Sequence, residues 1–426
     1  MKYSIQPDKT AYACYLTYFM SGVVILSFGA IMPELIIGKG LSYTLAGGLL
    51  TCLTIGNFLA TVLYPALCVR IKEKYVTTSL CFLYPICLFL FTVVGKVVLL
   101  YVLILLIGLN RGIITLTNNR TVNAATNNSP KHLNFLHMSY ALGALLSPFL
   151  IAILTRAGIG WETLLRAIAL ITFLIPIIYL CMDEEMLSGR LTADKAGQLS
   201  DVNSDEKVLS ECSDVSTGDV GNTRGGHAVS KSYFAVGGYY LALGMIFSYM
   251  GLENTVNGWF ETYLQQTGIM SETLATMMVS ITWLMIMIGR LVVAKLTEKV
   301  GTTTLLFTIT AVQFVAVILL LNAHTAASVV IALVLFGLGL AGIYPTLMAY
   351  TGRIVNNANL GMSVLTGIGT IGGMVLPQLI GIVADARGFS NAIVLMLVNS
   401  IILVILGFIT IPYGKRKEKY ENREQS

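Results

Sequence analysis

Charged side chains are scarce in this chain, and long apolar runs take their place. Only 12% of the residues are charged, 55% are hydrophobic, and the mean hydropathy is +0.77. Runs of about 20 apolar residues recur, which is the length that a helix needs to cross a bilayer. They are continuous and rich in Leu, Ile and Val, whereas the strands of a β-barrel would alternate with period two. We therefore predict an all-α membrane protein in the lipid bilayer.

The sequence also lacks the residue patterns of an enzyme. Its seven cysteines and four histidines have neither metal-ligand spacing nor the spacing of a secreted disulfide framework. Gly225-Gly226 is not followed by the Lys-Ser or Lys-Thr of a phosphate loop, and no nucleophile stands beside a base in a known pattern. We therefore predict no enzymatic activity, no cofactor and no metal.

Segments long enough to span a membrane occur twelve times. The predicted spans are 11–37, 42–68, 76–95, 97–123, 133–156, 162–181, 233–265, 272–294, 302–321, 326–352, 359–385 and 389–412. In the middle of the chain, ten acids and five bases lie among Ser, Gly and Asn, a composition that cannot form a core. The predicted segments are an N-terminal six-helix half (1–181), a flexible cytoplasmic linker (182–231), a C-terminal six-helix half (232–412) and a cytoplasmic tail (413–426).

The two halves repeat one another at a constant offset of 229 residues. The matched positions are Gly22 and Gly29 with Gly251 and Gly258, Leu67 and Arg70 with Leu296 and Lys299, Gly108 with Gly337, and Gly143 to Pro148 with Gly372 to Pro377. Duplicated membrane bundles of this kind usually hold a solute between their halves. The duplication therefore predicts a transporter.

The basic residues predict the orientation. With the N-terminus inside, 21 of the 27 Lys and Arg residues fall on the cytoplasmic side, as the positive-inside rule requires. Both termini are then cytoplasmic, in a multi-pass protein that we expect to be a monomer in the plasma (cytoplasmic) membrane. This topology also accounts for the net charge of +5, so we expect no nucleic-acid partner.

The loop after the eighth span carries a recognisable motif. Gly289-Arg290-Leu-Val-Val-Ala-Lys-Leu296 runs on through Glu298, Lys299 and Gly301, and it resembles the Gly-x-Leu-x-Asp-Arg-x-Gly signature of the major facilitator superfamily. A degraded copy after the second span includes Arg70. The resemblance implies that Arg70, Arg290, Glu298 and Lys299 latch the outward-facing state. The alternative is that these charges serve the positive-inside topology alone.

Four further segments resemble the fucose-permease branch of that superfamily. They are Leu133-Asn-Phe-Leu-His137, Gly251-Leu-Glu253 with Gly258-Trp259, Gly337-x-Gly339 with Ile343-Tyr-Pro345, and Gly372-Gly373 with Pro377. The resemblance implies two six-helix halves around a cavity and sugar uptake with protons. The branch often has an acid in the fourth span, but Thr115 stands at that position here.

Two charged residues near mid-membrane are the leading site candidates. Glu253 lies in the middle of the seventh span, where an unpaired carboxylate is costly, so we predict that it carries the coupling proton. Arg111 lies about fourteen residues into the fourth span and needs an anionic partner. That partner is either a solute carboxylate, sulfonate or phosphate, or Glu253 itself. Structural roles are the alternative for both residues.

Polar and aromatic neighbours would complete the pocket. Arg111, Thr115 and Asn118 share one helix face at i, i+4 and i+7. The predicted solute-binding residues are Arg111, Thr115, Asn118, Asn119, Asn254, Asn257, Trp259 and Tyr344, and His137 is a candidate gate. Asparagines can equally bond between helices, the aromatic rings can be packing, and His137 can be a helix-end hydrogen-bonding group.

The residues together predict a secondary active transporter that moves a small polar solute, a sugar or a sugar acid or other organic anion, by alternating access. The resemblance implies that the solute is a sugar, whereas Arg111 indicates an organic anion. A sugar acid would agree with both. Proton-coupled uptake is the expected direction and driving force. The alternatives are efflux of drugs or other lipophilic compounds, and a non-transporting sensor that uses the same fold.

Overall fold

The computed structural model describes residues 7–126, 130–182, 236–296, 299–355 and 359–424, and the elements assigned within them are helices. The helices of the first half are α1 (Pro7–Ala30), α2 (Met32–Lys39), α3 (Tyr43–Cys68), α4 (Glu73–Val93), α5 (Val97–Ala125), α6 (Pro130–Arg156), α7 (Trp161–Thr172) and α8 (Leu174–Cys181). Those of the second half are α12 (Gly237–Thr267), α13 (Glu272–Leu296), α14 (Thr302–Leu321), α15 (Ala326–Ala341), α16 (Ile343–Val355), α17 (Asn359–Arg387), α18 (Phe389–Ala392) and α19 (Val394–Glu424).

Within the described residues, twelve helical segments cross the bundle, of which eleven are long and apolar enough to span a membrane by length and composition. The twelfth is α12, which is 31 residues long but carries Glu253, Asn254, Asn257 and Glu261. It packs against α1 from the other half and against α13, α17 and α19 from its own. A helix enclosed by other helices does not need an apolar surface all round, which explains its lower hydropathy.

Several predicted spans are broken near prolines. The first is split between α1 and α2 at Ile31, and Pro33 stands in the first turn of α2. The sixth is split at Phe173 before Pro176, and the tenth at Gly342 before Pro345. A proline has no N–H to bond the carbonyl four residues earlier, so it favours a break there. The last span continues as α19 to Glu424, so residues 413–424 of the predicted tail are helical, whereas nearly all of the predicted linker 182–231 lies outside the described residues.

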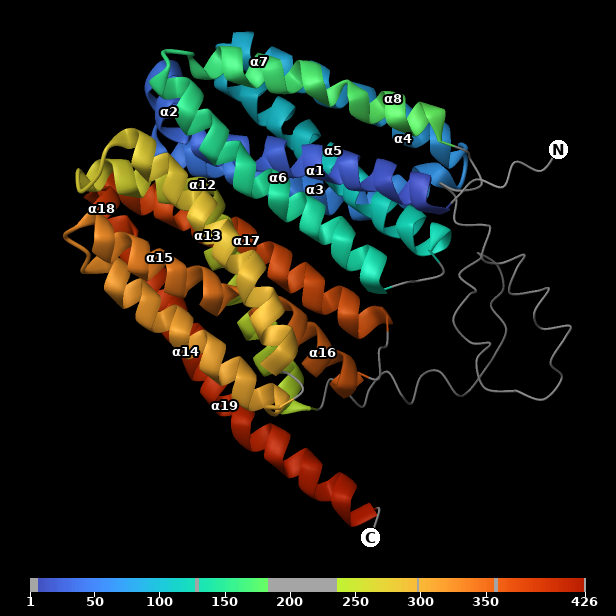
Figure 1. Ribbon diagram of the computed structural model, residues 1–426, viewed down its shortest axis with the longest axis vertical. Coiled ribbons are helices and arrows are strands. Elements are labelled where there is room, and N and C mark those ends of the chain that lie inside the picture. Colours follow the sequence, from blue (N-terminus) through green and yellow to red (C-terminus); the bar gives the residue numbers. More distant parts are fainter. Residues whose placement is uncertain (1–6, 127–129, 183–235, 297–298, 356–358, 425–426) are drawn as a thin grey trace, which may run out of the picture.

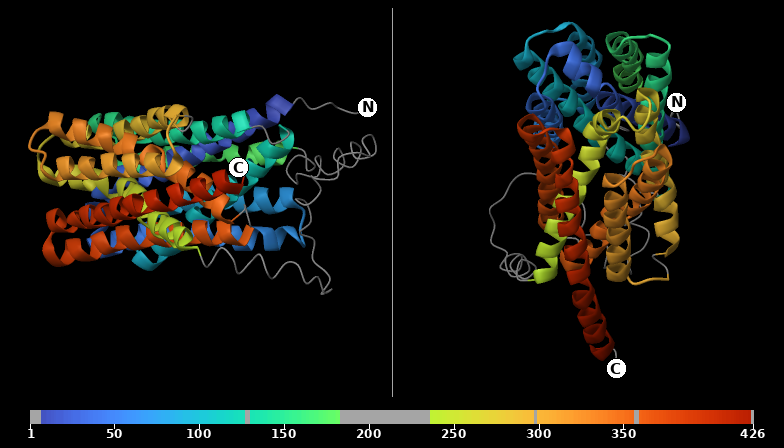
Figure 2. Two further views of the ribbon diagram at one scale, coloured as in Figure 1. Left: turned by 90° about the horizontal axis from the view of Figure 1, so that it is seen from below. Right: turned by 90° about the vertical axis from the view of Figure 1, so that its left-hand side faces the viewer.

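The helices form two bundles that lie side by side (Figure 1). In the first bundle α1 packs on α6 and α3 on α5, and in the second α12 packs on α17 and α13 on α15. These are corresponding pairs in the sequence repeat. The views in Figure 2 show the long helices of both bundles running along a common direction.

The repeated glycines occupy equivalent close crossings. A Cβ at Gly108 would lie 2.0 Å from Leu53 O, and one at Gly337 would lie 2.7 Å from Thr282 O. Leu53 and Thr282 are themselves separated by the repeat offset of 229. The two halves therefore share their packing as well as their sequence pattern, since only glycine lets the backbones approach this closely.

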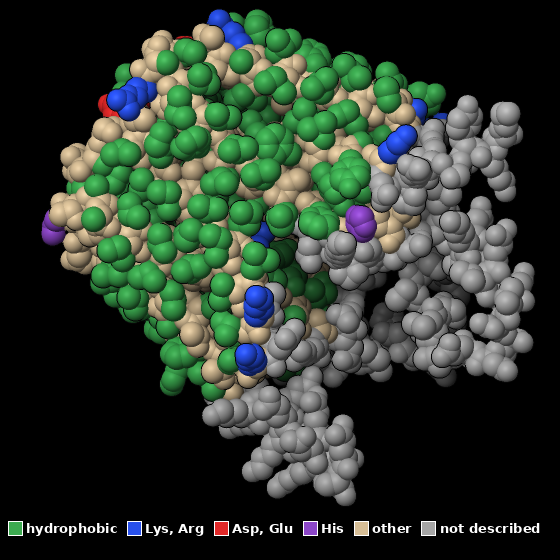
Figure 3. Space-filling model, in the orientation of Figure 1, with side chains coloured by type: hydrophobic (Ala, Val, Ile, Leu, Met, Phe, Trp, Pro, Cys, Tyr) green, Lys and Arg blue, Asp and Glu red, His purple; other side chains and the backbone are tan. Residues whose placement is uncertain are grey.

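The two ends of the bundle differ. We call the end where α1 begins the terminal end, and the end that carries α2 and α18 the opposite end (Figure 1). Among the described residues, hydrogen bonds between the halves gather at the opposite end: Asp385 accepts from Tyr43 N and Thr44 N at 2.8 and 2.7 Å, and Gln378 Nε2 donates to Thr44 O at 3.2 Å. Between the halves the surface is hollowed, with hydrophobic side chains in its depth (Figure 3).

Candidate solute-binding site

Arg111 lies near the middle of α5 and faces α6. Its guanidinium Nη2 donates to Tyr140 Oη at 3.2 Å, and its Cζ lies 5.9 Å from the centroid of the Tyr140 ring. Tyr18 on α1 stacks on Tyr140 with centroids 5.1 Å apart. A tyrosine hydroxyl is a neutral acceptor, so this contact orients the guanidinium without neutralising its charge.

Glu253 approaches the same group of side chains from the other half. It lies in the middle of α12, half-buried, and interacts electrostatically with Arg111 and Tyr140. Tyr249, one turn earlier on α12, interacts with its carboxyl, as does Tyr344 on α16. The structure therefore brings Arg111 and Glu253, predicted separately from the sequence, into one site between the halves.

Arg290 belongs to this site as well. It lies six residues before the end of α13 at Leu296, half-buried, and it acts electrostatically on Tyr18, Tyr140 and Tyr249. Its Nε is buried with no hydrogen-bond partner among the described residues. The sequence motif placed Arg290 in a gating loop, but its contacts place it inside the bundle, facing the tyrosines that also surround Arg111.

Aromatic side chains join the two halves at the level of Tyr140. Trp283 on α13 stands edge-on to the Tyr140 ring, with centroids 6.2 Å apart. Its Nε1 donates to Asn257 Oδ1 at 3.1 Å, so this predicted solute-binding residue orients a tryptophan of the site. Tyr344 lies 6.1 Å from the Tyr249 ring and is 37% exposed, which leaves part of its surface open.

The predicted polar face of α5 is divided in the structure. Thr115 Oγ1 donates to Arg111 O at 2.9 Å and is also a neighbour of Tyr18, so it lies beside the site. Asn119 donates to Thr115 O at 2.8 Å. Asn118 is fully buried between α1 and α8, bonded to Thr17 and Tyr179, and is not available to a solute in this conformation.

Two predicted solute ligands on α12 instead pack it against neighbouring helices. Trp259 is fully buried, its Nε1 donates to Pro377 O at 2.9 Å, and its ring contacts Tyr43 and Phe389. Asn254 Nδ2 donates to Gly373 O at 3.3 Å. These contacts tie α12 to α17 and, through Tyr43, to α3, so both residues hold helices together here.

The predicted gating residues fall into two groups. His137 is exposed, stands edge-on to Tyr18 at 5.7 Å, and interacts electrostatically with Arg290, which places it at the edge of the site. Arg70 and Lys299 are exposed near helix ends, while Glu298 lies outside the described residues. The predicted pairing of these loop charges into a latch therefore stays a prediction.

Sequence reasoning did not identify the aromatic residues of the site. Tyr18, Tyr140, Tyr249 and Trp283 are single aromatic residues in apolar helices, and no spacing sets them apart from packing residues. Arg290 did carry a usable signal, because it falls inside the predicted span 272–294 and not in the loop beyond it. A charge inside a span is a functional hypothesis by default.

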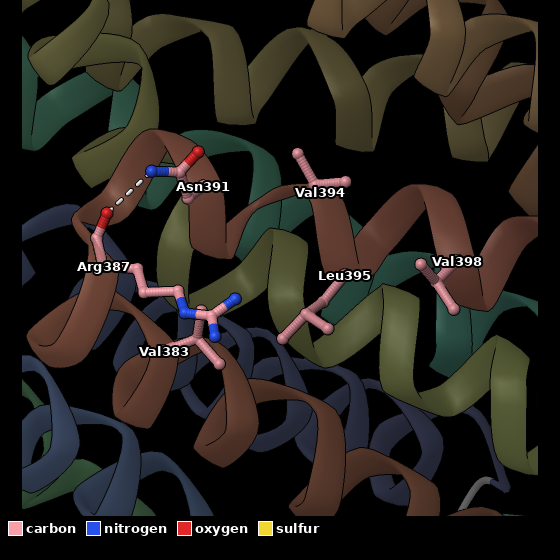
Figure 4. Close-up of a pocket in the computed structure, with 6 residues that line it drawn as sticks. All are labelled: Val383, Arg387, Asn391, Val394, Leu395 and Val398. Atoms are coloured by element: carbon pink, nitrogen blue, oxygen red, sulfur yellow. Dashed lines mark hydrogen bonds between the residues drawn. The ribbon is translucent and has the colours of Figure 1, made fainter.

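A separate groove lies at the opposite end, between α17 and the start of α19. It is lined by Val383, Arg387, Asn391, Val394, Leu395 and Val398 (Figure 4). Asn391 Nδ2 donates to Arg387 O at 2.7 Å, so the amide is engaged within its own turn of chain. None of these residues contacts Arg111, Glu253 or Arg290 in the described structure, so the groove is not part of the site.

Comparisons with known proteins agree with this architecture. The chain matches the Major Facilitator Superfamily over residues 14–377 and again over residues 241–426. Over 160 residues it is 28% identical to the Major facilitator superfamily domain-containing protein 4A of Xenopus tropicalis, a match that spans 37% of this chain and 31% of that protein.

Solved transporter structures are similar over nearly the whole chain. A bacterial homologue of the human lysosomal transporter Spinster, inward-facing and unoccupied, has a TM-score of 0.73 at 12% identity, covering 97% of this chain and 98% of that one. A D-xylose-proton symporter has a TM-score of 0.71 at 14% identity, covering 96% and 98%. The nucleoside transporter NupG has a TM-score of 0.64 at 13% identity, covering 95% and 98%.

At these identities the structures show a shared fold, and no particular branch of the superfamily follows from them. The match to the family covers most of the chain and extends over both halves. The twelve crossing helices, their division into two repeated bundles and the polar site between them agree with it. The chain belongs to the Major Facilitator Superfamily and is a multi-pass secondary transporter.

Proposed function

We propose that this transporter moves a small organic anion, such as a sugar acid, together with protons by alternating access. The observation that carries the proposal is the charge around the site. Two guanidinium groups, Arg111 from the first half and Arg290 from the second, act on the tyrosines of the site, and among the described residues the carboxylate that acts on these tyrosines is Glu253. A cation inside a membrane bundle needs an anionic partner, so one position remains for an anion from solution.

The tyrosines around the site support a polar solute. Tyr18 and Tyr140 lie close to both guanidinium groups, and Tyr249 and Tyr344 lie close to Glu253. Their hydroxyls can donate to sugar or carboxylate oxygens, and their rings can cover a sugar face. A lipophilic cation would instead meet two like charges, which disfavours the drug-efflux alternative.

Coupling to protons follows from competition for Arg111. When Glu253 is ionised, its carboxylate attracts Arg111 and opposes an anionic solute. When Glu253 is protonated, this competition disappears and the solute carboxylate can take its place beside Arg111. Solute and proton therefore bind together, and an inward proton gradient drives uptake. We further propose the plasma membrane with both termini in the cytoplasm, which would make the terminal end the cytoplasmic one.

The first experiment tests Glu253→Gln in proteoliposomes. Gln mimics the protonated acid, so the variant should lose gradient-driven accumulation of a sugar acid and keep solute exchange at equal concentrations on both sides. Wild-type protein should move protons when sugar acids or small carboxylates are added, and should not do so with neutral sugars or lipophilic cations. Full accumulation by Glu253→Gln would remove this residue from coupling.

A second experiment tests the anion. Arg111→Lys keeps the charge but loses the two-pronged contact with a carboxylate, so solute affinity should fall. One charge-assisted hydrogen bond is worth about 1.5 to 3 kcal/mol, which corresponds to about 10- to 150-fold in Kd. Lys295→Gln, an exposed change at the end of α13, serves as the control and should bind normally. Unchanged affinity in Arg111→Lys would make Arg111 a structural residue.

A further inference from the structure

A second carboxyl group on α12 has no counter-ion among the residues that the structure describes. Glu261 is 1% exposed and lies near the opposite end of the helix. Its Oε1 accepts from Gln265 Nε2 at 3.1 Å and from Thr276 Oγ1 on α13, and both donors are neutral. Its Oε2 is buried with no hydrogen-bond partner among the described residues.

In the described structure, the ionisable group that acts on Glu261 is itself an acid. Glu34 on α2, in the other half, interacts with Glu261 electrostatically, and its own Oε2 is buried without a hydrogen-bond partner. Glu34 in turn interacts with Glu272 at the start of α13. Among the described residues, no group of three or more Asp, Glu, His or Cys side chains is arranged to hold a metal ion. The site suits a proton better than a metal cation.

A fully buried carboxylate without a cation is among the least favourable arrangements in a protein, and nearby carboxylates worsen it. A neutral carboxylic acid removes the penalty, and Oε1 already receives both hydrogen bonds, which leaves Oε2 to carry the proton. We propose that Glu261 is a proton-binding site of the transporter, occupied whenever the opposite end is closed.

The position of Glu261 links this proton to the conformational change. It is enclosed by α12 and α13 of the second half, and α2 of the first half packs against α12 and brings Glu34 towards it. Opening the opposite end must separate α2 from α12, which admits water and removes the acidic neighbour. Both changes favour the ionised form, so the proton is released to solution on that side. By linkage, acid on that side favours closure and alkali favours opening.

This site is distinct from Glu253. The two residues are eight positions apart on α12, about 12 Å along the helix axis. Glu253 acts electrostatically on Arg111, whereas the ionisable group that acts on Glu261 in the described structure is the carboxyl of Glu34. The proposal therefore holds or fails separately from the role of Glu253 in solute coupling.

The test measures closure of the opposite end as a function of pH. Spin labels are placed at Ile37 on α2 and Ser390 on α18, both exposed, in protein whose seven cysteines have been replaced. Distances between the labels are then measured without solute. In the otherwise wild-type protein the ratio of closed to open forms should rise as pH falls, by up to about tenfold per pH unit for one proton. In Glu261→Gln the opposite end should stay closed at every pH.

Two controls separate this result from other causes. Glu162→Gln makes the same chemical change at the start of α7, at the same end of the bundle, and should keep the pH response. Glu253→Gln should also keep it while losing gradient-driven accumulation. A pH-independent distance in the wild type, or a wild-type pH response in Glu261→Gln, would overturn the proposal.

An infrared measurement covers the case in which Glu261→Gln purifies poorly. A protonated carboxylic acid has a C=O stretching band that a carboxylate lacks. At neutral pH the wild type should show this band, and Glu261→Asp, which retains a titratable group, should shift it. A band that is absent from the wild type, or unchanged in the variant, would mean that Glu261 is ionised in the closed form.

Discussion

Asp385 at the end of α17 is the sharpest point at which to test how the opposite end is held closed. Its carboxylate accepts from Tyr43 N at 2.8 Å and from Thr44 N at 2.7 Å, at the start of α3 in the other half. The first N–H groups of a helix have no partner within it and carry partial positive charge. Asp385 therefore caps a helix across the interface between the two halves.

The size of the effect follows from the capping geometry. Losing a side-chain cap costs about 0.5 to 2 kcal/mol, and a carboxylate near a helix N-terminus adds about 0.3 to 1 kcal/mol when exposed. Asp385 is exposed, so we take the lower part of the combined range, about 1 to 2 kcal/mol. Asp385→Ala should therefore shift the ratio of closed to open forms by about 5- to 30-fold towards opening.

The spin-label pair at Ile37 and Ser390 measures this shift directly. Because the interaction is exposed, the difference between wild type and Asp385→Ala should shrink as salt is raised. Thr325→Ala is the matched control: Thr325 Oγ1 accepts from Ser328 N at 3.2 Å at the start of α15, within the second half. Losing this cap should lower overall stability without changing the ratio of closed to open forms, because the cap lies within one half. Equal populations in the wild type and Asp385→Ala would refute the reasoning.

Two further predictions concern stability. Arg120→Gln should lower the melting temperature more than Arg156→Gln, an exposed control. The reason is that Arg120 Nη2 and Nη1 contact the buried carboxylate of Glu73 at 2.9 and 3.0 Å. Arg120 is 40% exposed, so we expect the free energy of unfolding to fall by about 1 to 3 kcal/mol, below the range for a fully buried pair. Gly108→Ala should lower the free energy of unfolding by about 1 to 3 kcal/mol, because the added Cβ would lie 2.0 Å from Leu53 O. Gly95→Ala is the control, because a Cβ there meets open space and should be tolerated. Equal melting temperatures for the two variants would contradict this prediction.

The sequence was a good guide to the fold because bilayer thickness fixes the length of apolar runs. Composition alone identifies eleven of the twelve crossing helices. The remaining helix, α12, was predicted because Gly251 and Gly258 repeat Gly22 and Gly29, and not because of its hydropathy. Breaks such as that at Ile31 were missed, because hydropathy is unchanged where a helix bends.

The site was only partly predictable. Arg111 and Glu253 were found because charge inside a membrane is costly and needs a reason. Asn118 and Trp259 were expected to face a solute, yet both are buried against neighbouring helices. In helices that are apolar on most faces, no stripe of polar residues reveals which side faces the cavity, so the direction of an individual side chain depends on tertiary packing.

The placement of two acids on one helix bears on how alternating access and proton binding are joined. Glu253 acts electrostatically on Arg111. Glu261 is buried further along α12, past Trp259, whose ring contacts Tyr43 of the other half. Only a carboxyl that water can reach exchanges its proton readily with solution. In the closed form Glu253 is half-buried, whereas Glu261 is enclosed until the opposite end opens. If both proposals hold, separating the two halves at the opposite end would expose the two proposed proton sites to different solutions in turn, without any unwinding of α12.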